Sequence, residues 1–266
     1  MYGYIKKETK MKIRLLHFLA VALLAIGLCA CEKPANTAPT PKVYRVGMNA
    51  AFAPFGSVDT NGKIVGFDVD IMQAVADQAG IKIVWVNTPW EGIFSTLANA
   101  DIDIIASGVT ITDERKQSML FSDPYFEAKQ VILVSPGKKI GSPDDLKQAH
   151  RVGVTAGTSA DTIMQKMLGK TSNALVRFES LPLLLKEVDN GGVDAAVGDN
   201  GAVANHLKFN KDKGFKLIES DKFEKEYYGI AVRPADTDLM AKINNALKAL
   251  HSNGSYDKIY ASYFAK

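Results

Sequence analysis

The sequence predicts an α/β fold of two similar lobes, and three observations support this. Short apolar runs alternate with longer amphipathic runs from residue 43 onward, which is the rhythm of strand and helix units in a largely parallel sheet. The rhythm restarts after the turn-rich segment SPGKKIGSPDDL at 135–146. Two extended runs, at about 128–134 and 227–233, are expected to cross between the lobes. The chain would therefore leave its first lobe and return to it.

The first half of the chain supplies six of the expected elements. The helix over 67–80 places apolar residues on one face and ends at Gly80. The expected order is a strand at 43–49, this helix, a strand at 81–87, a helix at about 92–100, and strands at 101–107 and 129–134.

The second half repeats the alternation and adds a helical end. We expect strands at 151–157, 175–180, 193–199 and 227–234, with helices at 158–168, 181–192, 239–254 and 256–264. No internal sequence repeat is strong enough to prove that the two lobes are related.

The N-terminal residues have the pattern of an export signal. Five basic residues against Glu8 give residues 1–30 a charge of +4, and an apolar run at 15–28 follows that is too short to span a membrane. We interpret 1–30 as a lipoprotein signal peptide, with Met11 rather than Met1 as a candidate start. The LCAC sequence resembles a bacterial lipobox that ends at Cys31, the expected lipidation site, and 31–42 is expected to be a lipidated tether.

Composition restricts the function of the remaining chain. The whole chain has a formal charge of +3 and residues 1–30 carry +4, so the remaining residues carry −1. A nearly neutral folded part argues against a nucleic-acid partner. Both cysteines lie at 29 and 31, so no internal disulfide is expected in the folded part. The four histidines show no metal-site spacing, and no phosphate loop or nucleophile elbow is present; we therefore expect neither a cofactor nor a metal.

The segment SGVTITDERKQSMLFSDPYF, at 107–126, combines a Ser-Gly turn, threonine hydroxyls and Arg115. Backbone N–H groups, hydroxyls and a forked guanidinium are all donors that suit a carboxylate. The alternative is that Arg115 is a surface charge paired with Asp113 or Glu114.

Several motifs in the same order give a more specific interpretation. AAFAPFGSVDTNGKIVGFDVDI, WEGIFSTLANADIDIIASGVTITDERKQSMLFSDPYF, VGVTAGTSAD, VDAAVGD and YDKIYASYF together resemble the polar amino acid family of extracellular solute-binding proteins, solute-binding protein family 3, which serves ABC transporters. The resemblance covers residues 43–266. It implies a bilobed periplasmic-binding-protein type II fold, with 43–131 and 230–266 as lobe 1 and 132–229 as lobe 2. It also implies a monomer that closes on one amino acid and delivers it to an inner-membrane permease, from the periplasm or the cell surface.

The resemblance also assigns roles to individual residues. The family's carboxylate clamp falls on Ser107, Gly108, Thr110, Arg115, Thr158 and Ser159, its amino-group aspartate on Asp199, its ligand-flanking aromatics on Phe52 and Trp90, and its side-chain contacts on Asn49 and Thr155. Without the resemblance, Asp199 could equally cap the helix expected near residue 202, and the two aromatic residues could be core.

The ligand's side chain is the open part of this interpretation. Asn49 replaces an aspartate and Thr155 replaces a lysine that some relatives carry, which favours a neutral polar ligand such as glutamine or cystine. The alternative is a basic amino acid, arginine above all, with Glu91 as a possible partner. We expect no enzymatic activity. Further alternatives are a ligand sensor, a surface antigen, or a dehydratase-like enzyme that uses Glu91 and Asp199 as an acid/base pair.

Overall fold

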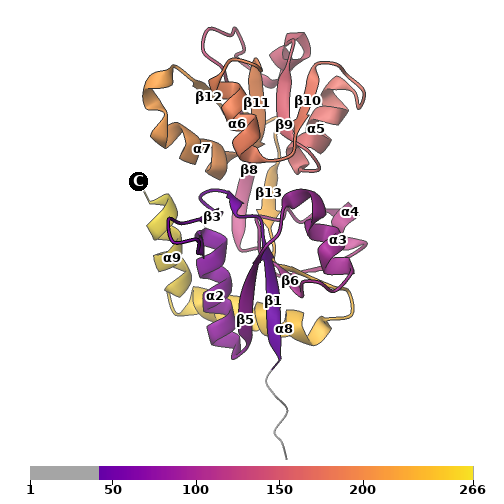
Figure 1. Ribbon diagram of the computed structural model, residues 1–266, viewed down its shortest axis with the longest axis vertical. Helices are drawn as coiled ribbons and strands as arrows, with labels where there is room; N and C mark the ends of the chain where they lie inside the picture. The colour runs from indigo at the N-terminus through magenta and orange to yellow at the C-terminus, as the bar shows by residue number, and fades with distance from the viewer. Residues whose placement is uncertain (1–41, 266) are drawn as a thin grey trace, which may run out of the picture. The chain divides into compact units, whose positions relative to one another are not determined.

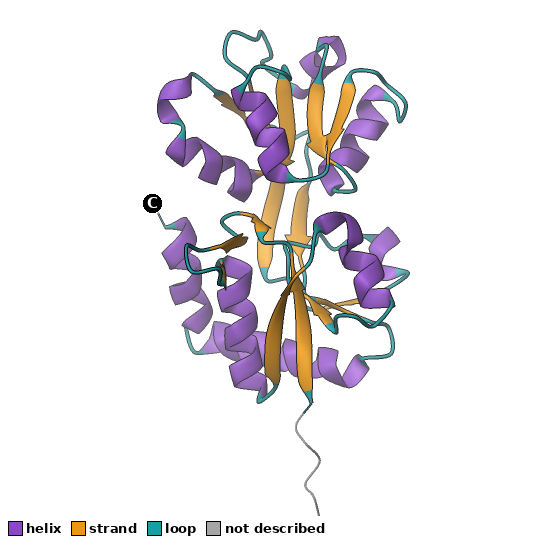
Figure 2. Ribbon diagram, viewed as in Figure 1, coloured by secondary structure: helices purple, strands orange, loops and turns teal. Residues whose placement is uncertain are grey.

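Two β-sheets, each flanked by helices, organise the part of the chain that this computed structural model describes, residues 42–265 (Figures 1 and 2). The expected signal peptide, the candidate start at Met11, Cys31 and all but the last residue of the expected tether lie outside the described residues. We call the residues around the first sheet lobe 1 and those around the second sheet lobe 2.

The sheet of lobe 1 has five strands in the order β5-β1-β6-β14-β7. Its parallel pairs join β1 to β5 and to β6, and β14 runs antiparallel to both β6 and β7. The strands are β1 Val43–Met48, β5 Lys82–Asn87, β6 Ile104–Ile105, β7 Leu120–Phe121 and β14 Ala231–Val232. The strand expected at 101–107 is thus reduced to two residues, Ile104–Ile105, and the backbone turns at Gly108, whose φ is 56°.

Helices cover both faces of this sheet. Helix α2 carries Asp68 and Asp70 in its first turn, where the helix dipole favours them, and ends at Gly80 in the left-handed conformation, as the sequence predicts. The helical elements of lobe 1 are α2 Phe67–Ala79, η1 Trp90–Gly92, α3 Ile93–Ala98, α4 Asp113–Lys116, α8 Thr237–Ser252 and α9 Ser255–Phe264.

Lobe 2 repeats the strand and helix alternation around a second sheet, ordered β10-β9-β11-β8-β12. Strand β9 is parallel to β10 and β11, whereas β8 is antiparallel to β11 and β12. The strands are β8 Phe126–Val134, β9 Val152–Thr155, β10 Leu175–Phe178, β11 Ala195–Asp199 and β12 Lys216–Ile218; the helical elements are η2 Pro143–Gln148, α5 Ser159–Leu168, α6 Leu181–Asp189, α7 Asn200–Phe209 and η3 Lys211–Lys213. The predicted α/β fold with two mixed, helix-flanked sheets is confirmed.

Two antiparallel strands connect the lobes, and Figure 1 shows them side by side between the two sheets. Residues 126–129 of β8 pair with β13, Lys225–Tyr228. The strand expected over 227–234 is divided: β13 pairs with β8, whereas β14 joins the sheet of lobe 1. The division falls at Gly229, whose N–H donates to the Val109 carbonyl at 3.0 Å and whose position leaves no room for a side chain beside Ile111.

Most of the elements not predicted from the sequence are short: the strand β7, the helical elements α4, η2 and η3, and several strands of two or three residues. A three-stranded sheet is formed by β2 Ala51–Phe52, β3 Gly56–Val58 and β4 Ile64–Val65, and β12 adds an edge strand to lobe 2. Strands of two or three residues show too little alternation to be recognised from hydrophobic periodicity.

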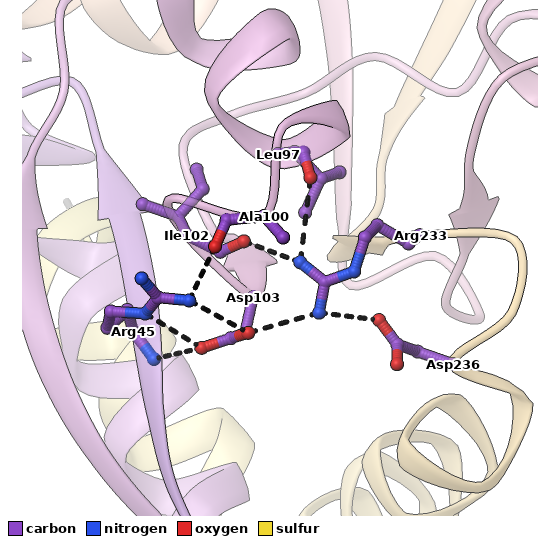
Figure 3. Close-up of polar contacts among 7 residues, drawn as sticks. All are labelled: Arg45, Leu97, Ala100, Ile102, Asp103, Arg233 and Asp236. Carbon is purple, nitrogen blue, oxygen red and sulfur yellow. Dashed lines mark hydrogen bonds and ion pairs between the residues drawn. The ribbon is translucent and has the colours of Figure 1, made fainter.

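The buried carboxylate of Asp103 joins the return crossing to the sheet of lobe 1 (Figure 3). Asp103 Oδ2 accepts from Arg45 N at 2.9 Å and Arg45 Nε at 3.2 Å, and its Oδ1 accepts from Arg233 Nη2 at 3.0 Å. Burial alone would raise the pKa of Asp103, but these hydrogen bonds hold it below its usual value. The network fixes β1, the start of β6 and the residues after β14 relative to one another.

Candidate functional site

One cavity between the two lobes is lined by all eleven residues that the sequence analysis selects. These are Asn49, Phe52, Trp90, Ser107, Gly108, Thr110, Arg115, Thr155, Thr158, Ser159 and Asp199, together with Ala160, Leu181, Val197 and Gly198. The structure therefore brings the selected side chains together from both lobes. The contact of each one with a ligand stays a prediction. Glu91 is exposed and is not among the residues that line this cavity.

The Ser-Gly turn that follows β6 forms part of the cavity wall in lobe 1. Gly108 has a φ of 56°, and a Cβ at this position would lie 2.5 Å from a ring carbon of Phe52. Its N–H donates to Asp68 Oδ2 at 2.6 Å, while Ser107 Oγ accepts from Asn49 N at 3.0 Å. The Gly108 N–H, expected to face an anion, is therefore bonded within the protein.

Asp68 is a buried partner of this turn that the sequence analysis does not select. It lies in the first turn of α2 with only 1% of its surface exposed. Burial raises the pKa of its carboxyl to about 7, even though the Gly108 N–H favours the charged form. The N–H of the Ser-Gly turn therefore bonds to Asp68 rather than to a group in the cavity.

Arg115 projects from the short helix α4 and spans the two lobes. Its Nη1 donates to the Thr110 carbonyl at 2.9 Å and its Nη2 to the Gly157 carbonyl at 3.3 Å. The guanidinium also lies 5.4 Å from the ring centre of Trp90 and 5.1 Å from that of Phe94. Neither Asp113 nor Glu114 forms an ion pair with Arg115 in the structure; Asp113 pairs with Lys116 at 3.3 Å instead.

The electrostatic surroundings of Arg115 are those of a partly buried cation near the carboxylates of Asp199, Glu226 and Glu114. Burial lowers its pKa, and the charges of Asp199 and Glu226 oppose that effect. A guanidinium stays protonated under such conditions, so the cavity keeps one positive charge.

Hydroxyl groups at the start of α5 form the cavity wall in lobe 2. Thr158 caps this helix, accepting from Asp161 N at 3.3 Å and donating to the Thr155 carbonyl at 2.7 Å. Ser159 follows as the first helical residue, and its Oγ donates to Glu226 Oε2 at 2.7 Å. The helix cap thus aligns three predicted side chains at one edge of lobe 2.

Asp199 ends β11 at the N-cap position of α7, yet its side chain makes no capping hydrogen bond. Its Oδ1 instead accepts from Gln130 Nε2 at 2.9 Å. Burial and the neighbouring charge of Glu226 together raise the pKa of Asp199 to about 6, against the lowering effect of the Gln130 hydrogen bond. The carboxyl is therefore close to its titration point at neutral pH and would be stabilised by an incoming cation.

Gln130 and Glu226, which lie on the two connecting strands, are also not predicted from the sequence. Gln130 is fully buried on β8, and its Nε2 donates to Glu226 Oε2 at 3.0 Å. A polar residue inside the apolar run KQVILV is a signal that could have identified Gln130. Glu226 lies in the charged sequence EKEYY, and no sequence signal distinguishes it from the exposed residues Glu224 and Lys225.

In residues 42–265, no cluster of three or more His, Cys, Asp or Glu side chains is arranged to hold a metal ion. No helix within this same range has the length and apolar character needed to cross a membrane.

Comparison with known proteins identifies the family. Residues 44–266 match the model of the bacterial extracellular solute-binding proteins, family 3. The chain belongs to this family. The members of this family are solute-binding proteins rather than enzymes. The dehydratase-like alternative therefore does not apply to this chain.

Similar proteins agree in size and in fold. The chain is 48% identical, over 93% of its length and 94% of the relative, to a protein of Neisseria gonorrhoeae named a probable histidine-binding protein. It matches the solved arginine-, lysine-, histidine-binding protein of Geobacillus stearothermophilus with a TM-score of 0.80 and 41% identity, covering 85% of this chain and 96% of that one. It also matches an ancestral arginine-binding protein solved with glutamine, with a TM-score of 0.79 and 39% identity, over 85% and 100% of the two chains.

Proposed function

We propose that this solute-binding protein binds a basic L-amino acid between its lobes and delivers it to an ABC transporter permease. The observation that carries the choice of ligand is the charge around the cavity. Two carboxylates, Asp199 and Glu226, act on the single guanidinium of Arg115. A zwitterionic amino acid adds no net charge, whereas one with a cationic side chain balances the extra carboxylate.

The names of the relatives support the same ligand class. One relative is named a probable histidine-binding protein, and another is named an arginine-, lysine-, histidine-binding protein. This favours the basic alternative over the neutral ligand that the sequence analysis places first. Glutamine is the second candidate, because Asn49 carries no charge and an ancestral arginine-binding protein was solved with glutamine.

The proposed pose places each polar group of the ligand near a matching protein group. The α-carboxylate lies against the Arg115 guanidinium, and the α-ammonium against Asp199. The side chain then lies between Phe52 and Trp90, where aromatic faces can contact an imidazole or a guanidinium. Each ligand thereby touches both lobes, as hinge closure requires.

The moving parts are proposed from the chain's path. Residues 43–131 and 230–266 would move as one lobe against 132–229, with β8 and β13 bending between them. Small-angle scattering should show a smaller radius of gyration when the correct amino acid is added. An unchanged radius with a bound ligand would argue against this division.

A thermal-shift screen of the twenty amino acids, with cystine and ornithine added, tests the ligand class. A ligand at 100 times its dissociation constant stabilises the folded protein by about 2.7 kcal/mol. We expect arginine, lysine or histidine to give the largest shift, followed by calorimetry to rank them. A larger shift with glutamine or cystine would show that the ligand class is wrong.

A lipid on Cys31 is the proposed anchor, with the protein held at the membrane surface on the periplasmic or outer side. The residue lies outside the described part of the chain, so the proposal depends on the sequence pattern alone. Cys31→Ala should move the protein from the membrane fraction to the soluble fraction, because acyl chains supply stable attachment. Unchanged membrane association would exclude this anchor.

A further inference from the structure

The carboxylate of Glu226 lies where lobe 1, lobe 2 and the two connecting strands meet. Its Oε2 accepts from Thr110 Oγ1 of lobe 1 at 3.3 Å and from Ser159 Oγ of lobe 2 at 2.7 Å. Glu226 itself lies on β13, and its third donor, Gln130 Nε2 at 3.0 Å, lies on the paired strand β8. One oxygen atom therefore bonds to groups from three parts of the molecule.

Gln130 fixes the geometry of this cluster. Its side chain is fully buried, and Nε2 is surrounded by oxygens of Asp199 at 2.9 Å, Glu226 at 3.0 Å and Ser159 at 3.1 Å. An amide nitrogen has two hydrogens, which satisfy the two carboxylates, while the Ser159 hydroxyl supplies its own hydrogen to Glu226. The amide orientation is thus determined by its neighbours, and Gln130 links the Asp199 carboxylate to Glu226.

These bonds depend on the lobes being close together. Thr110 and Ser159 approach each other to 3.5 Å across the cavity, and Arg115 Nη2 reaches the Gly157 carbonyl at 3.3 Å in the same region. Rotation about the connecting strands that separates Thr110 from Ser159 removes at least one of the two hydroxyls from Glu226. The carboxylate would then lose bonds that are present only when the lobes are closed.

We propose that Glu226 is a positioning residue that ties Thr110 to Ser159 and thereby stabilises the closed arrangement of the lobes, whatever side chain the ligand carries. The inference rests on the proposed closure of the lobes but not on the proposed ligand class. A bond made only in the closed state raises the closed population of the free protein. Because the apparent dissociation constant varies inversely with that population, every ligand gains by the same factor.

The test compares Glu226→Gln with Glu224→Gln, which removes the same charge from an exposed residue two positions away. Calorimetry with arginine and with glutamine, and scattering of the ligand-free protein, are measured for both variants. Hydrogen bonds to a charged group predict that Glu226→Gln weakens both ligands, by about tenfold or more, and increases the radius of gyration. Arginine should lose more than glutamine, because it also loses the carboxylate that balances its side-chain charge. Glu224→Gln should change neither.

Several results would overturn the proposal. A loss confined to arginine would mean that Glu226 acts only as a charge. Equal effects of the two variants would mean that only net charge matters. A lower melting temperature with unchanged affinity and radius would mean a purely structural role.

A second variant covers the case in which Glu226→Gln does not fold. Ser159→Ala removes the 2.7 Å bond from the lobe 2 side and changes only one hydroxyl. It should likewise increase the radius of the free protein. In the Ser159→Ala background, Glu226→Gln should have a smaller effect than in the parent, since the two residues form one bond. Additive effects of the two substitutions would contradict the proposed link between Glu226 and Ser159.

Discussion

Two groups of residues around the cavity differ in how they are held. The anchoring group, Thr110, Arg115, Ser159 and Asp199, is connected by hydrogen bonds and charges, to Gln130 and Glu226 among others. The selecting group, Asn49, Phe52, Trp90 and Thr155, carries no formal charge. Its rings pack on neighbouring rings, with centres 5.0 Å apart for Phe52 and Phe55 and 5.1 Å for Trp90 and Phe94.

The difference suggests a division of tasks. Every amino acid has the same carboxylate and ammonium, so a rigid, charged set can supply affinity common to all ligands. The side chain varies, and neutral residues on an aromatic framework can be exchanged to change specificity without disturbing the anchor. The predictions below test whether the two groups separate in this way.

The largest effect should come from Arg115→Ala. Removal of the guanidinium leaves the ligand carboxylate unpaired in a closed site, which costs about 2 to 5 kcal/mol, or roughly 30-fold to several thousand-fold in dissociation constant. Calorimetry should show this loss with arginine, histidine and glutamine alike. Lys116→Ala, an exposed change in the same helix, is the control. If Arg115→Ala binds as tightly as the parent, the anchoring role of this residue is wrong.

The next effect is the pH dependence that Asp199 imposes. With a pKa of about 6 in the free protein, the carboxyl must lose a proton to hold an ammonium, so affinity should fall about tenfold between pH 7 and pH 5. Arginine is the suitable ligand because its own charge is constant over this range. Asp199→Asn should bind more weakly and show a flat profile between these pH values. If the affinity of Asp199→Asn falls with pH as steeply as that of the parent, the titrating group is not Asp199.

The same group should act in the opposite direction on the stability of the ligand-free protein. Its folded-state pKa of about 6 lies above the value of about 3.9 in an unfolded chain, so the group favours the folded state below pH 4. That contribution is lost as the pH rises through 6. Denaturant unfolding should therefore give similar stabilities for the parent and Asp199→Asn at pH 4, with the parent losing stability relative to the variant as the pH rises to 7; a difference that does not change with pH would contradict the raised pKa.

Gly108→Ala should weaken the anchoring group through the backbone. A side chain at a φ of 56° is strained by about 1 to 3 kcal/mol, and the added Cβ meets the Phe52 ring. We expect lower thermal stability and about tenfold weaker binding of all ligands, since both the turn and an aromatic wall must shift. Gly62→Ala is a matched control, because its φ is 79° and nothing lies within 4 Å of the added carbon. Equal ligand affinities of the two variants would mean that the turn at Gly108 does not contribute to binding.

Asn49→Asp should produce the smallest change and should affect the selecting group alone. A new carboxylate near the ligand side chain contributes about 1 kcal/mol in a partly solvated site, so arginine should gain about fivefold relative to glutamine. Asn61→Asp, at an exposed position in the same lobe, controls for net charge. An unchanged ranking of ligands would mean that Asn49 does not face the side chain.

The two groups also differ in what the sequence can predict. The anchoring residues occur in local patterns, such as SGVTITDER and AVGDN, whose chemistry is visible in a single segment. Their assembly from both lobes follows from the alternation of strands and helices, which the structure confirms. The short strands β2, β3, β4 and β12 have no such pattern.

The interactions that the sequence does not reveal are those made between distant segments. Asp68 receives the Gly108 N–H from forty residues away, and Glu226 meets Ser159 across 67 residues. Residue type and spacing do not distinguish Glu226 from exposed Glu224; the difference is that Glu226 lies within β13, opposite Ala128 of β8, whereas Glu224 lies just before the strand. Asn49 and Thr155 alone likewise do not predict the side chain of the ligand. The charge of Glu226 also matters, and Glu226 lies in a different segment of the chain.

The most direct measurement of the division between anchoring and selecting residues is a crystal structure of the protein with its tightest-binding basic amino acid. We expect the α-carboxylate within hydrogen-bonding distance of Arg115, the α-ammonium within that distance of Asp199, and the side chain between Phe52 and Trp90. A ligand bound in the reverse orientation, with its side-chain cation at Asp199 and its ammonium among the aromatic residues, would contradict the account.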